Sequence, residues 1–515
     1  MNGFLRLPDT IHTIPEALAF WAAVTPDAPA LRALDGRTAT FRELHAATNA
    51  VAARLAARGI GPEDRVAFFL EPGFAATIAL LGTMATAIAV PLNPVSAAPE
   101  LDRDLARLLP RLLIADGSGL PAAGIASDLG IPFVPLAAVA ACSISPDIQQ
   151  RLPDLQSPAP ETIAAIIHTS GTTGLPKRVL RAHRSFLAGA RAARDSSALT
   201  PDDVLLLTPS LHTNAGLVNL CAALANGGCC VIATGFDPGD FPDLLDVQQP
   251  TWMASNAAEL NRILAAAAFR GRDQIAGPSS RLRLIRAGAQ AMTPGTAERA
   301  EASLRAVVFD GFGMSEASYV TASGPTPADR REGATGRPWR AEIRILGERG
   351  EHLPLGATGE VVIRGETLFS GYLDDPEANA AAALPGGWFR TGDLGFLDTD
   401  GYLTLTGRRN ELINRGGEKI APVEVDRLLL THPAVADAAA FAVPDPRLGE
   451  DIVAAVVLRP GMAVTPRELR RWLLDHLTPY KVPRRIWLVD DLPRTVTGKV
   501  QRGVLTDRYR RRHRP

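Results

Sequence analysis

The sequence predicts an α/β protein built from a large N-terminal domain and a small C-terminal α/β domain. Its 515 residues exceed the roughly 250–300 residues at which a single hydrophobic core stops growing, so at least two domains are expected. From about residue 15, helical stretches rich in alanine and leucine alternate with short apolar strands, which predicts layered α/β subdomains. The pattern changes near residue 325 and again near Arg408, which predicts a small antiparallel β region followed by the second domain.

The strands of the layered region are predicted from short apolar runs bounded by turn signals. They lie at residues 65–70, 86–93, 161–170, 203–210, 228–235 and 283–288. Residues 74–92 are uncharged and are the one candidate for a membrane-spanning segment. Because Gly82 interrupts this stretch and Pro91 lies near its end, we expect a buried helix that runs into a buried strand, and no insertion into a membrane.

After residue 325 the pattern is that of antiparallel strands. Residues 341–365 alternate between polar and apolar side chains, and the alternation continues to residues 401–407. Beyond Arg408 a helix, two strands and an amphipathic helix are expected in that order, at residues 421–433, 440–445, 451–458 and 465–477. Thr465 is the expected N-cap of the last helix. The boundary near residues 408–410 divides the chain into residues 1–408 and 409–515.

Composition and charge indicate an ordinary globular protein. Hydrophobic residues make up 46% of the chain, charged residues make up 21%, and the formal net charge is −1. No global field therefore points to nucleic acid or to an acidic membrane surface as a partner. The arginine-rich end at residues 508–515 is expected to be a solvated terminus.

The four cysteines predict a reduced, cytoplasmic protein. Cys142, Cys221, Cys229 and Cys230 show no Cys-x-x-Cys spacing, and the adjacent pair lies in an apolar run typical of a buried strand. Reduced core thiols are therefore favoured over a metal site or a disulfide framework. The first ten residues also lack the uninterrupted apolar stretch of a secretory signal.

Lysine is scarce in this chain. Only four of its 54 basic residues are lysines, namely Lys177, Lys419, Lys481 and Lys499. A lysine kept against so strong a bias toward arginine is a candidate for a role that needs a compact, mobile positive charge.

The strongest local signal is the stretch HTSGTTGLPK at residues 168–177, directly after an apolar strand. Its two glycines let backbone amides face an anion, its hydroxyl residues donate hydrogen bonds, and Lys177 supplies a movable charge. These features are typical of a loop that binds phosphate groups. The stretch is not a Walker A loop, because proline precedes the lysine and Arg178 follows it in place of serine or threonine.

A second signal is GFGMSEA at residues 311–317. Phe312 offers a flat apolar face and Ser315 a hydroxyl, while Glu316 offers a carboxylate suited to hold Mg²⁺ against phosphates. Taken alone, the segment is equally typical of a strand that ends in a turn.

Three further segments are weak signals when each is taken alone. In FRTGDLG (389–395), Asp393 is expected in a tight turn beside Gly392, with its carboxylate available to ribose hydroxyls. The other two segments are GRRNELINRGGEKIAPVEV (407–425) and PRTVTGKVQR (493–502), the latter with Lys499 in a turn.

In this order and at these distances, the five segments resemble the adenylate-forming superfamily of acyl-CoA synthetases, luciferases and nonribosomal-peptide adenylation domains. The resemblance covers nearly the whole chain. It implies an ATP-dependent, AMP-forming acyl-CoA synthetase that activates a small or medium carboxylic acid as an acyl-adenylate and then forms the thioester of coenzyme A. It also implies Mg²⁺ and a mobile C-terminal domain that rotates between the two steps.

The resemblance assigns ATP binding to the phosphate loop and to four later positions. The loop residues are Thr169, Ser170, Gly171, Thr172, Thr173, Gly174 and Lys177. The later residues are Phe312 near adenine, Ser315 on the α-phosphate, and Asp393 and Arg408 on the ribose. Glu316 is implied as the Mg²⁺ ligand. Lys499 is implied as the catalytic lysine that bridges the attacking carboxylate and the α-phosphate.

The acyl pocket, the coenzyme A channel and the hinge are implied in the same way. His212 is the implied gate of the acyl pocket and counts with Lys499 and Glu316 among the catalytic candidates. The other implied pocket residues are Asn214, Asn256, Arg286, Gly288, Ala289 and Tyr319. Gly416 and Gly417 are implied beside the pantetheine channel, and Asn410 at the hinge.

Within the superfamily the sequence is most similar to the oxalyl-CoA synthetase type, through His168 and residues 283–289 and 410–426. The polar pocket candidates favour a small polar acid over a long alkyl chain. Several positions depart from the familiar pattern, so the identity of the acid stays open. Arg178 replaces Gly, Asn410 replaces Asp or Lys, Tyr319 replaces His, and Ser255-Asn256-Ala257 replaces Val-Pro-Thr.

Two alternatives stay open. A stand-alone adenylating enzyme that loads the phosphopantetheine arm of a carrier protein would share these motifs, because both acceptors present the same thiol. A non-catalytic nucleotide-binding homologue is the other alternative, and the retention of five motif residues speaks against it: Lys177, Glu316, Asp393, Arg408 and Lys499. A homodimer is not decided by the sequence.

Overall fold

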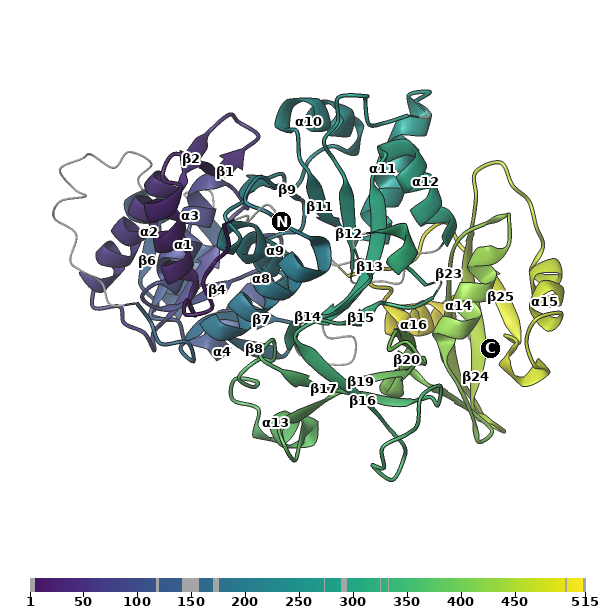
Figure 1. Cartoon of the computed structure of the whole chain (residues 1–515). Helices are drawn as coiled ribbons and strands as arrows, with labels where there is room; N and C mark the ends of the chain where they lie inside the picture. Colours follow the sequence, from purple (N-terminus) through teal and green to yellow (C-terminus); the bar gives the residue numbers. More distant parts are fainter. Residues whose placement is uncertain are drawn as a thin grey trace.

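The computed structural model describes residues 5–116, 120–140, 157–169, 176–272, 274–288, 294–324, 326–331, 333–495 and 498–512. Within these residues the chain forms four β-sheets with helices packed against them (Figure 1). The order of the sheets along the chain agrees with the predicted order of regions, since two α/β layers precede an antiparallel sheet and a final α/β unit.

The first sheet has six strands in the order β6-β5-β3-β4-β7-β8, parallel throughout except for the antiparallel pair β7 and β8. Its strands are β3 (Arg65–Phe69), β4 (Ile88–Pro91), β5 (Leu112–Ala115), β6 (Phe133–Pro135), β7 (Ile163–His168) and β8 (Arg178–Ala182). The helices between them are α3 (Phe74–Met84), α4 (Ala98–Leu108), α5 (Leu120–Asp128) and α6 (Leu136–Val139). Residues 74–92 therefore form the predicted buried helix and buried strand. Among the described residues, no helix combines the length and the apolar character needed to cross a membrane.

The second sheet has nine strands in the order β15-β14-β13-β12-β11-β9-β10-β1-β2. They are β1 (Pro29–Ala33), β2 (Thr38–Thr40), β9 (Val204–Leu207), β10 (Cys229–Ile232), β11 (Trp252–Ser255), β12 (Leu284–Ala287), β13 (Val307–Met314), β14 (Ala317–Ala322) and β15 (Arg337–Pro338). The associated helices are α1 (Ile14–Val24), α2 (Phe41–Ala56), α8 (His183–Ser197), α9 (Asn214–Ala225), α10 (Phe241–Gln248), α11 (Ala257–Phe269) and α12 (Pro294–Leu304). The chain also makes 3-10 turns at η1 (Pro238–Asp240) and η2 (Pro327–Asp329).

One hydrophobic core joins the first two sheets. Trp21 and Phe186 are fully buried in it, and they pack with residues of both sheets and of the helices between them. The indole N–H of Trp21 donates a hydrogen bond of 2.9 Å to the carbonyl of Ala225, which ties α1 to the end of α9. The fused core fixes β8 and β14 relative to each other, and both strands carry residues of the site described below.

The third sheet is the predicted antiparallel region. It contains β16 (Ala341–Leu346), β17 (Gly359–Gly365), β18 (Ala383–Leu384), β19 (Trp388–Leu397) and β20 (Leu403–Arg408), with α13 (Pro376–Ala382) beside it. One prediction is wrong here, because Asp393 lies within β19 and not in a tight turn. Gly392 takes a φ of 72°, and the pairing of β17 with β19 shifts register at this point. The strand therefore continues past the glycine with a local bulge.

The C-terminal unit begins after β20 with the turn η3 (Arg409–Glu411) and forms a sheet of its own. It contains β21 (Ile413–Arg415), β22 (Glu418–Ile420), β23 (Val435–Asp445), β24 (Gly449–Leu458), β25 (Arg485–Leu488), α14 (Pro422–Thr431), α15 (Pro466–Leu474), η4 (Pro479–Lys481) and α16 (Arg502–Arg512). The predicted N-cap is confirmed, since Thr465 forms a capping box with Glu468. Two hydrophobic clusters fill this unit, which lies at one side of the molecule beside β19 and β20 (Figure 1).

Candidate active site

The predicted phosphate loop is closed at its base by two hydrogen bonds. β7 ends at His168 and β8 begins at Arg178, so the loop joins two antiparallel neighbours. The backbone N–H of Thr169 donates to the carbonyl of Lys177 at 2.9 Å, and the N–H of Lys177 donates to the hydroxyl of Thr169 at 3.1 Å. The loop residues between them, Ser170, Gly171, Thr172, Thr173 and Gly174, lie outside the described residues. The Lys177 ammonium lies 4.4 Å from the centre of the Tyr372 ring.

Ser315 and Glu316 form the tight turn between β13 and β14. A side chain at Gly313 would overlap the carbonyl oxygen of Ser318, so the two strands approach too closely there for any other residue. Glu316 is only 7% exposed, and its Oε1 accepts a hydrogen bond of 2.8 Å from the Tyr372 hydroxyl. Phe312 lies in β13 below the turn and packs in the hydrophobic core of the third sheet.

Asp393 and Arg408 are direct partners across β19 and β20. The Arg408 Nε donates to Asp393 Oδ1 at 2.9 Å. The second carboxylate oxygen of Asp393 is buried and accepts no hydrogen bond from the residues that the structure describes. Burial raises the pKa of Asp393, while the charges of Arg408 and Lys499 oppose this shift. An oriented carboxylate with one unused, buried oxygen suits an acceptor for a ligand hydroxyl.

Lys499 reaches this pair from the C-terminal unit. Gly498 beside it takes a φ of 86°, and the N–H of Thr495 donates to the carbonyl of Lys499 at 2.8 Å. Burial lowers the pKa of Lys499, and the neighbouring Arg408 charge lowers it further. The carboxylates of Asp393 and Glu316 act in the opposite direction. The structure thus brings four predicted residues together from two domains, Glu316, Asp393, Arg408 and Lys499.

Behind the Ser315–Glu316 turn lies Arg181, a residue that sequence reasoning missed. Its side chain on β8 is fully buried, and in the described part of the chain no carboxylate forms an ion pair with it. Burial lowers the pKa of Arg181 to about 10, so it stays charged at neutral pH. Its Nη1 donates to the Ser315 carbonyl and to Asn214 Oδ1, both at 2.9 Å.

The remaining donors of Arg181 bind hydroxyl groups. Its Nη2 bonds to Ser318 on β14, and its Nε donates to Ser185 on α8 at 3.1 Å. One guanidinium therefore ties the strand after the phosphate loop to α8, α9 and the Ser315–Glu316 turn.

The predicted acyl-pocket gate His212 lies in the turn before α9. Its Nδ1 is 2.7 Å from the Ser210 hydroxyl, and burial lowers its pKa to about 4. The ring is therefore neutral at pH 7, with Ser210 fixing its orientation. His168, at the end of β7, has its pKa lowered to about 4 as well, first by burial and then by the charge of Arg178.

Arg286, Tyr319 and Asn219 form a buried polar cluster between β12, β14 and α9. The Arg286 guanidinium lies 3.6 Å from the centre of the Tyr319 ring, and the Tyr319 hydroxyl donates to Asn219 Oδ1 at 2.5 Å. The Arg286 Nη1 also donates to the hydroxyls of Ser196 and Ser197, each at 3.3 Å. No carboxylate among the described residues pairs with Arg286, which is 5% exposed.

Two predicted pocket residues are engaged by the protein itself. Asn214 accepts from Arg181 and donates through Nδ2 to the Met314 carbonyl at 2.9 Å, so its amide joins α9 to β8 at one end and to β13 at the other. Asn256 caps α11, since its Oδ1 accepts the N–H of Glu259 at 2.9 Å. Gly288 follows β12 directly, and Ala289 lies outside the described residues.

The predicted hinge residue Asn410 lies in η3 between two ion-paired neighbours. Arg409 pairs with Glu360 of β17 at 3.2 Å, and Glu411 pairs with Arg502 of α16 at 3.3 Å. Gly416 and Gly417 make the turn between β21 and β22, with φ values of 62° and 100°. Lys419, two residues later, pairs with Glu348 in the loop between β16 and β17 at 3.3 Å.

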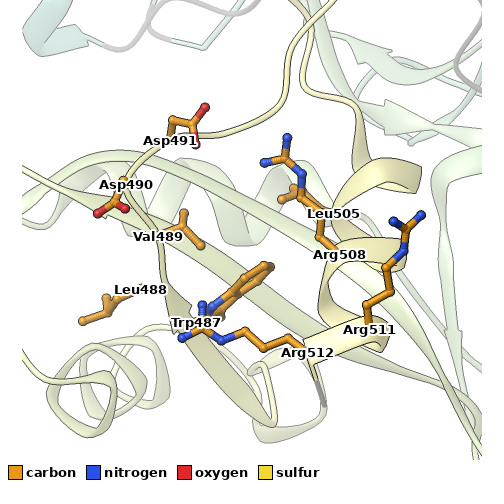
Figure 2. Close-up of a pocket in the computed structure, with 9 residues that line it drawn as sticks. All are labelled: Trp487, Leu488, Val489, Asp490, Asp491, Leu505, Arg508, Arg511 and Arg512. Atoms are coloured by element: carbon orange, nitrogen blue, oxygen red, sulfur yellow. The ribbon is translucent and has the colours of Figure 1, made fainter. Parts of the chain in front are cut away.

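A separate surface cavity of about 670 Å³ lies between β25 and α16. Trp487, Asp490 and Asp491 line one side and Arg508, Arg511 and Arg512 the other (Figure 2). It contains none of the predicted site residues.

Both regions of the chain match models of known protein families. Residues 18–373 match the model of the AMP-binding enzyme, and residues 424–499 match that of the AMP-binding enzyme C-terminal domain. A sulfoacetate–CoA ligase of Cupriavidus necator is 35% identical over 96% of this chain and 97% of its own length. An oxalate–CoA ligase of Arabidopsis thaliana is 34% identical, covering 94% of this chain and 96% of its own.

Solved structures show the same likeness over the whole length. ATP-bound MatB from Rhodopseudomonas palustris superposes with a TM-score of 0.85 at 27% identity, covering 96% of this chain and 99% of that one. The o-succinylbenzoate–CoA synthetase of Bacillus subtilis, in complex with its acyl-adenylate, gives a TM-score of 0.82 at 27% identity, with 96% and 98% covered.

Proposed function

Because the chain belongs to the AMP-binding enzyme family, we propose a role for each group of its active site in acid activation and thioester formation. The enzyme is an ATP-dependent, AMP-forming acyl-CoA synthetase. A carboxylate oxygen attacks the α-phosphorus of ATP and pyrophosphate leaves. The thiolate of coenzyme A then attacks the acyl carbon, and AMP leaves. The proposal rests on the position of Lys499, which lies close enough to Asp393 and Arg408 for their charges to act on its ammonium group.

Each residue in this arrangement has a definable task in the first step. Lys499, held near Asp393 and Glu316, brings a positive charge to the place where negative charge gathers between the carboxylate and the α-phosphate. The unused oxygen of Asp393 accepts a hydrogen bond from a ribose hydroxyl, while Arg408 fixes its orientation. Thr169 and Lys177 close the loop that cradles the outer phosphates.

The residues present fit a magnesium ion bound together with the phosphates. Mg²⁺ in such sites takes one or two carboxylates from the protein and further oxygens from the substrate and water. Glu316 is a buried carboxylate with one oxygen held by Tyr372 and the other free of protein hydrogen-bond donors among the described residues. We assign Glu316 as the protein ligand. When bound, the ion neutralises charge that develops on the phosphate oxygens.

The acid that best suits the pocket is small and carries a second anionic group. Arg286 is a buried cation without a carboxylate partner among the described residues, and Tyr319 stacks on it. A buried, unpaired charge is unfavourable unless an opposite charge joins it. An anionic group of the substrate, directed toward Arg286, would supply that charge. Oxalate and sulfoacetate, the acids named for the two curated relatives above, both have this character.

The second step requires the C-terminal unit to move. In the structure, Lys499 lies beside the ATP-site residues. The Gly416–Gly417 turn lies near the β16–β17 loop, because Lys419 just after the turn pairs with Glu348 of that loop. We propose that residues 409–515 rotate about Asn410, so that the glycine turn replaces the lysine and borders the pantetheine channel. The buried, free thiols of Cys221, Cys229 and Cys230 fit a reducing compartment such as the cytoplasm.

Pyrophosphate release over a panel of carboxylic acids, with and without coenzyme A, tests the function. Paired acids that differ only in the second anionic group, such as oxalate against acetate, test the pocket. We expect release with the diacid and the sulfonated acid, and a thioester only with coenzyme A. Release with monocarboxylic acids alone would overturn the assignment to Arg286. Thioester formation on a holo-carrier protein and not on coenzyme A would overturn the assigned acceptor.

A further inference from the structure

Tyr372 lies in the segment between β17 and α13, and its backbone is locked in place. Its N–H donates to Asn379 Oδ1 at 2.7 Å, and Asn379 Nδ2 donates back to the Tyr372 carbonyl at 2.9 Å. The Phe369 and Tyr372 rings pack in a T-shaped arrangement, with 4.8 Å between the ring centres. The Tyr372 side chain is 5% exposed, so its position is well determined by packing.

The same segment is attached to the two strands that carry the phosphate-binding candidates. On β8, Leu180 donates to the Gly371 carbonyl and Ser370 donates to the Leu180 carbonyl, each at 2.9 Å. At the start of β14, Phe369 donates to the Glu316 carbonyl at 2.8 Å. The segment therefore bridges the strand after Lys177 and the strand after Glu316.

The Tyr372 side chain contacts both of these residues at once. Its hydroxyl donates to Glu316 Oε1 at 2.8 Å, while the face of its ring lies 4.4 Å from the Lys177 ammonium. The phenol hydroxyl is the donor of this hydrogen bond and the Glu316 carboxylate is its acceptor.

These two contacts act on different groups. The hydroxyl occupies one oxygen of Glu316, which leaves Oε2 to face a cation in a single orientation. The ring face attracts the Lys177 ammonium through a cation–π interaction and holds it beside the phosphate loop. Because both contacts come from one rigid side chain, they fix the distance between the carboxylate and the ammonium.

We propose that Tyr372 is a positioning residue that holds the Glu316 carboxylate and the Lys177 ammonium at the separation needed to bind the magnesium–ATP complex. The inference rests on the function proposed above. It assigns a task to a residue that belongs to none of the five motifs.

The test uses substitutions that separate the two contacts. Tyr372→Phe removes the hydroxyl and keeps the ring, whereas Tyr372→Leu removes both. Tyr402→Phe is the matched control, because Tyr402 is a buried tyrosine directly before β20 whose ring faces Arg331 and Arg337 instead of the site. ATP affinity is measured by titration calorimetry on the full-length variants, once with Mg²⁺ and once with a chelator. Thermal melting of each variant checks that it is folded.

For Tyr372→Phe we expect the Mg²⁺-dependent gain in ATP affinity to fall about 10-fold, with the affinity in chelator unchanged. For Tyr372→Leu the affinity in chelator should also fall, by about 3-fold, because Lys177 loses its aromatic partner. Tyr402→Phe should match the wild type in both conditions.

Three outcomes would contradict the roles assigned to Tyr372 and Glu316. If Mg²⁺ raises the ATP affinity of Tyr372→Phe as much as it raises that of the wild type, the role of Tyr372 is wrong. The same holds if Tyr372→Phe loses ATP affinity equally with Mg²⁺ and with chelator. Neither result contradicts the proposed function. A wild-type enzyme that binds ATP equally with and without Mg²⁺ overturns the assignment of Glu316 and this inference with it. Pyrophosphate release by the wild type tests the reaction separately.

Discussion

At the scale of single residues, Lys499 is the group whose removal should separate the two half-reactions. Lys499→Ala should lower acyl-adenylate formation at least about 100-fold, since it removes a charge directed at the developing anion. Thioester formation from supplied acyl-adenylate should remain near the wild-type rate, because the lysine is proposed to leave the site before that step. Quenched-flow assays of each half-reaction measure the two rates.

The control for this substitution is Lys481→Ala, in the same C-terminal unit. Lys481 pairs with Glu424 at 2.7 Å and forms no ion pair with a site residue in the described part of the chain. Both half-reactions should be retained in that variant. An equal loss of both half-reactions in Lys499→Ala would contradict the assigned role.

A second prediction for a single residue concerns Arg181. Arg181→Gln removes the guanidinium that holds Ser315 and Asn214, so adenylation kcat should fall about 10- to 100-fold through misplacement of the turn. Arg191→Gln is the matched control, because Arg191 is a buried arginine of α8 that donates to the carbonyls of Pro8 and Ile11, remote from the site.

Both arginine variants should melt earlier than the wild type, since each loses buried hydrogen bonds. Only Arg181→Gln should lose kcat beyond what its folded fraction explains. Parallel losses in the two variants would show that Arg181 contributes to stability alone.

The motif residues could be predicted from the sequence because their spacing within each segment is local. Arg181 and Tyr372 could not, since their partners lie far away along the chain. The Arg181 bond to Ser315 spans 134 residues, and the Tyr372 bond to Glu316 spans 56. For Arg181 the one local signal is its place in a short apolar strand, RVLRA, which is typical of an arginine with buried polar contacts.

At the scale of elements, the β13–β14 pair depends on a single glycine. A side chain at Gly313 would overlap the Ser318 carbonyl, and that atom belongs to backbone that cannot turn aside. Gly313→Ala should therefore force the strands apart, destabilise the protein by about 1–3 kcal/mol and lower adenylation more than 10-fold. Chemical denaturation and pyrophosphate release measure the two effects.

Gly503→Ala is the control for the glycine substitution. Gly503 lies in α16, and nothing lies within 4 Å of an added Cβ there. Alanine at this position should leave adenylation intact and raise stability by up to about 1 kcal/mol, because glycine is a poor helix former. Full adenylation activity in Gly313→Ala would contradict the proposed close approach.

The elements themselves were predictable to within a few residues wherever apolar runs end in turn signals. Strands β3, β4 and β9 lie within the predicted ranges for this reason. The prediction failed at Asp393, where glycine next to aspartate is typical of a turn. Pairing of β19 with both β17 and β20 keeps the strand continuous there, and the strand forms a bulge at Gly392.

At the scale of the whole molecule, three buried histidines predict how stability depends on pH. Burial lowers the pKa of His168, His183 and His212 to about 4, from an ordinary value of 6.5. Between these two values the unfolded chain binds protons that the folded chain does not, so stability falls as the pH falls. Each histidine contributes a slope of about 1.4 kcal/mol per pH unit within that window.

The variant His183→Leu tests this dependence without touching the site, because His183 is a fully buried residue of α8. The loss of stability between pH 7 and pH 5.5, measured by urea unfolding, should be smaller than in the wild type by about 1 kcal/mol in total. Buried acids with raised pKa, such as Glu259 and Asp426, oppose the trend equally in both proteins. Identical pH slopes would contradict the neutral state of His183.

The arrangement of the sheets was beyond prediction from the sequence, because it depends on contacts between distant segments. β1 pairs with β10 across some two hundred residues, and the order of the nine strands follows no local pattern. The change in character near Arg408 was visible, since the strands that follow form a separate sheet. The hinge at Asn410 stays a prediction.

The scarcity of lysine has a practical consequence for following motion in this enzyme. An amine-reactive label can modify only four side chains and the N-terminus, so peptide mapping assigns every product without ambiguity. Lys499 is shielded by the ATP-site residues, whereas Lys419 is largely exposed. The ratio of label on Lys499 to label on Lys419 thus forms an intrinsic footprint of the C-terminal unit, readable by mass spectrometry during turnover and without any engineered probe.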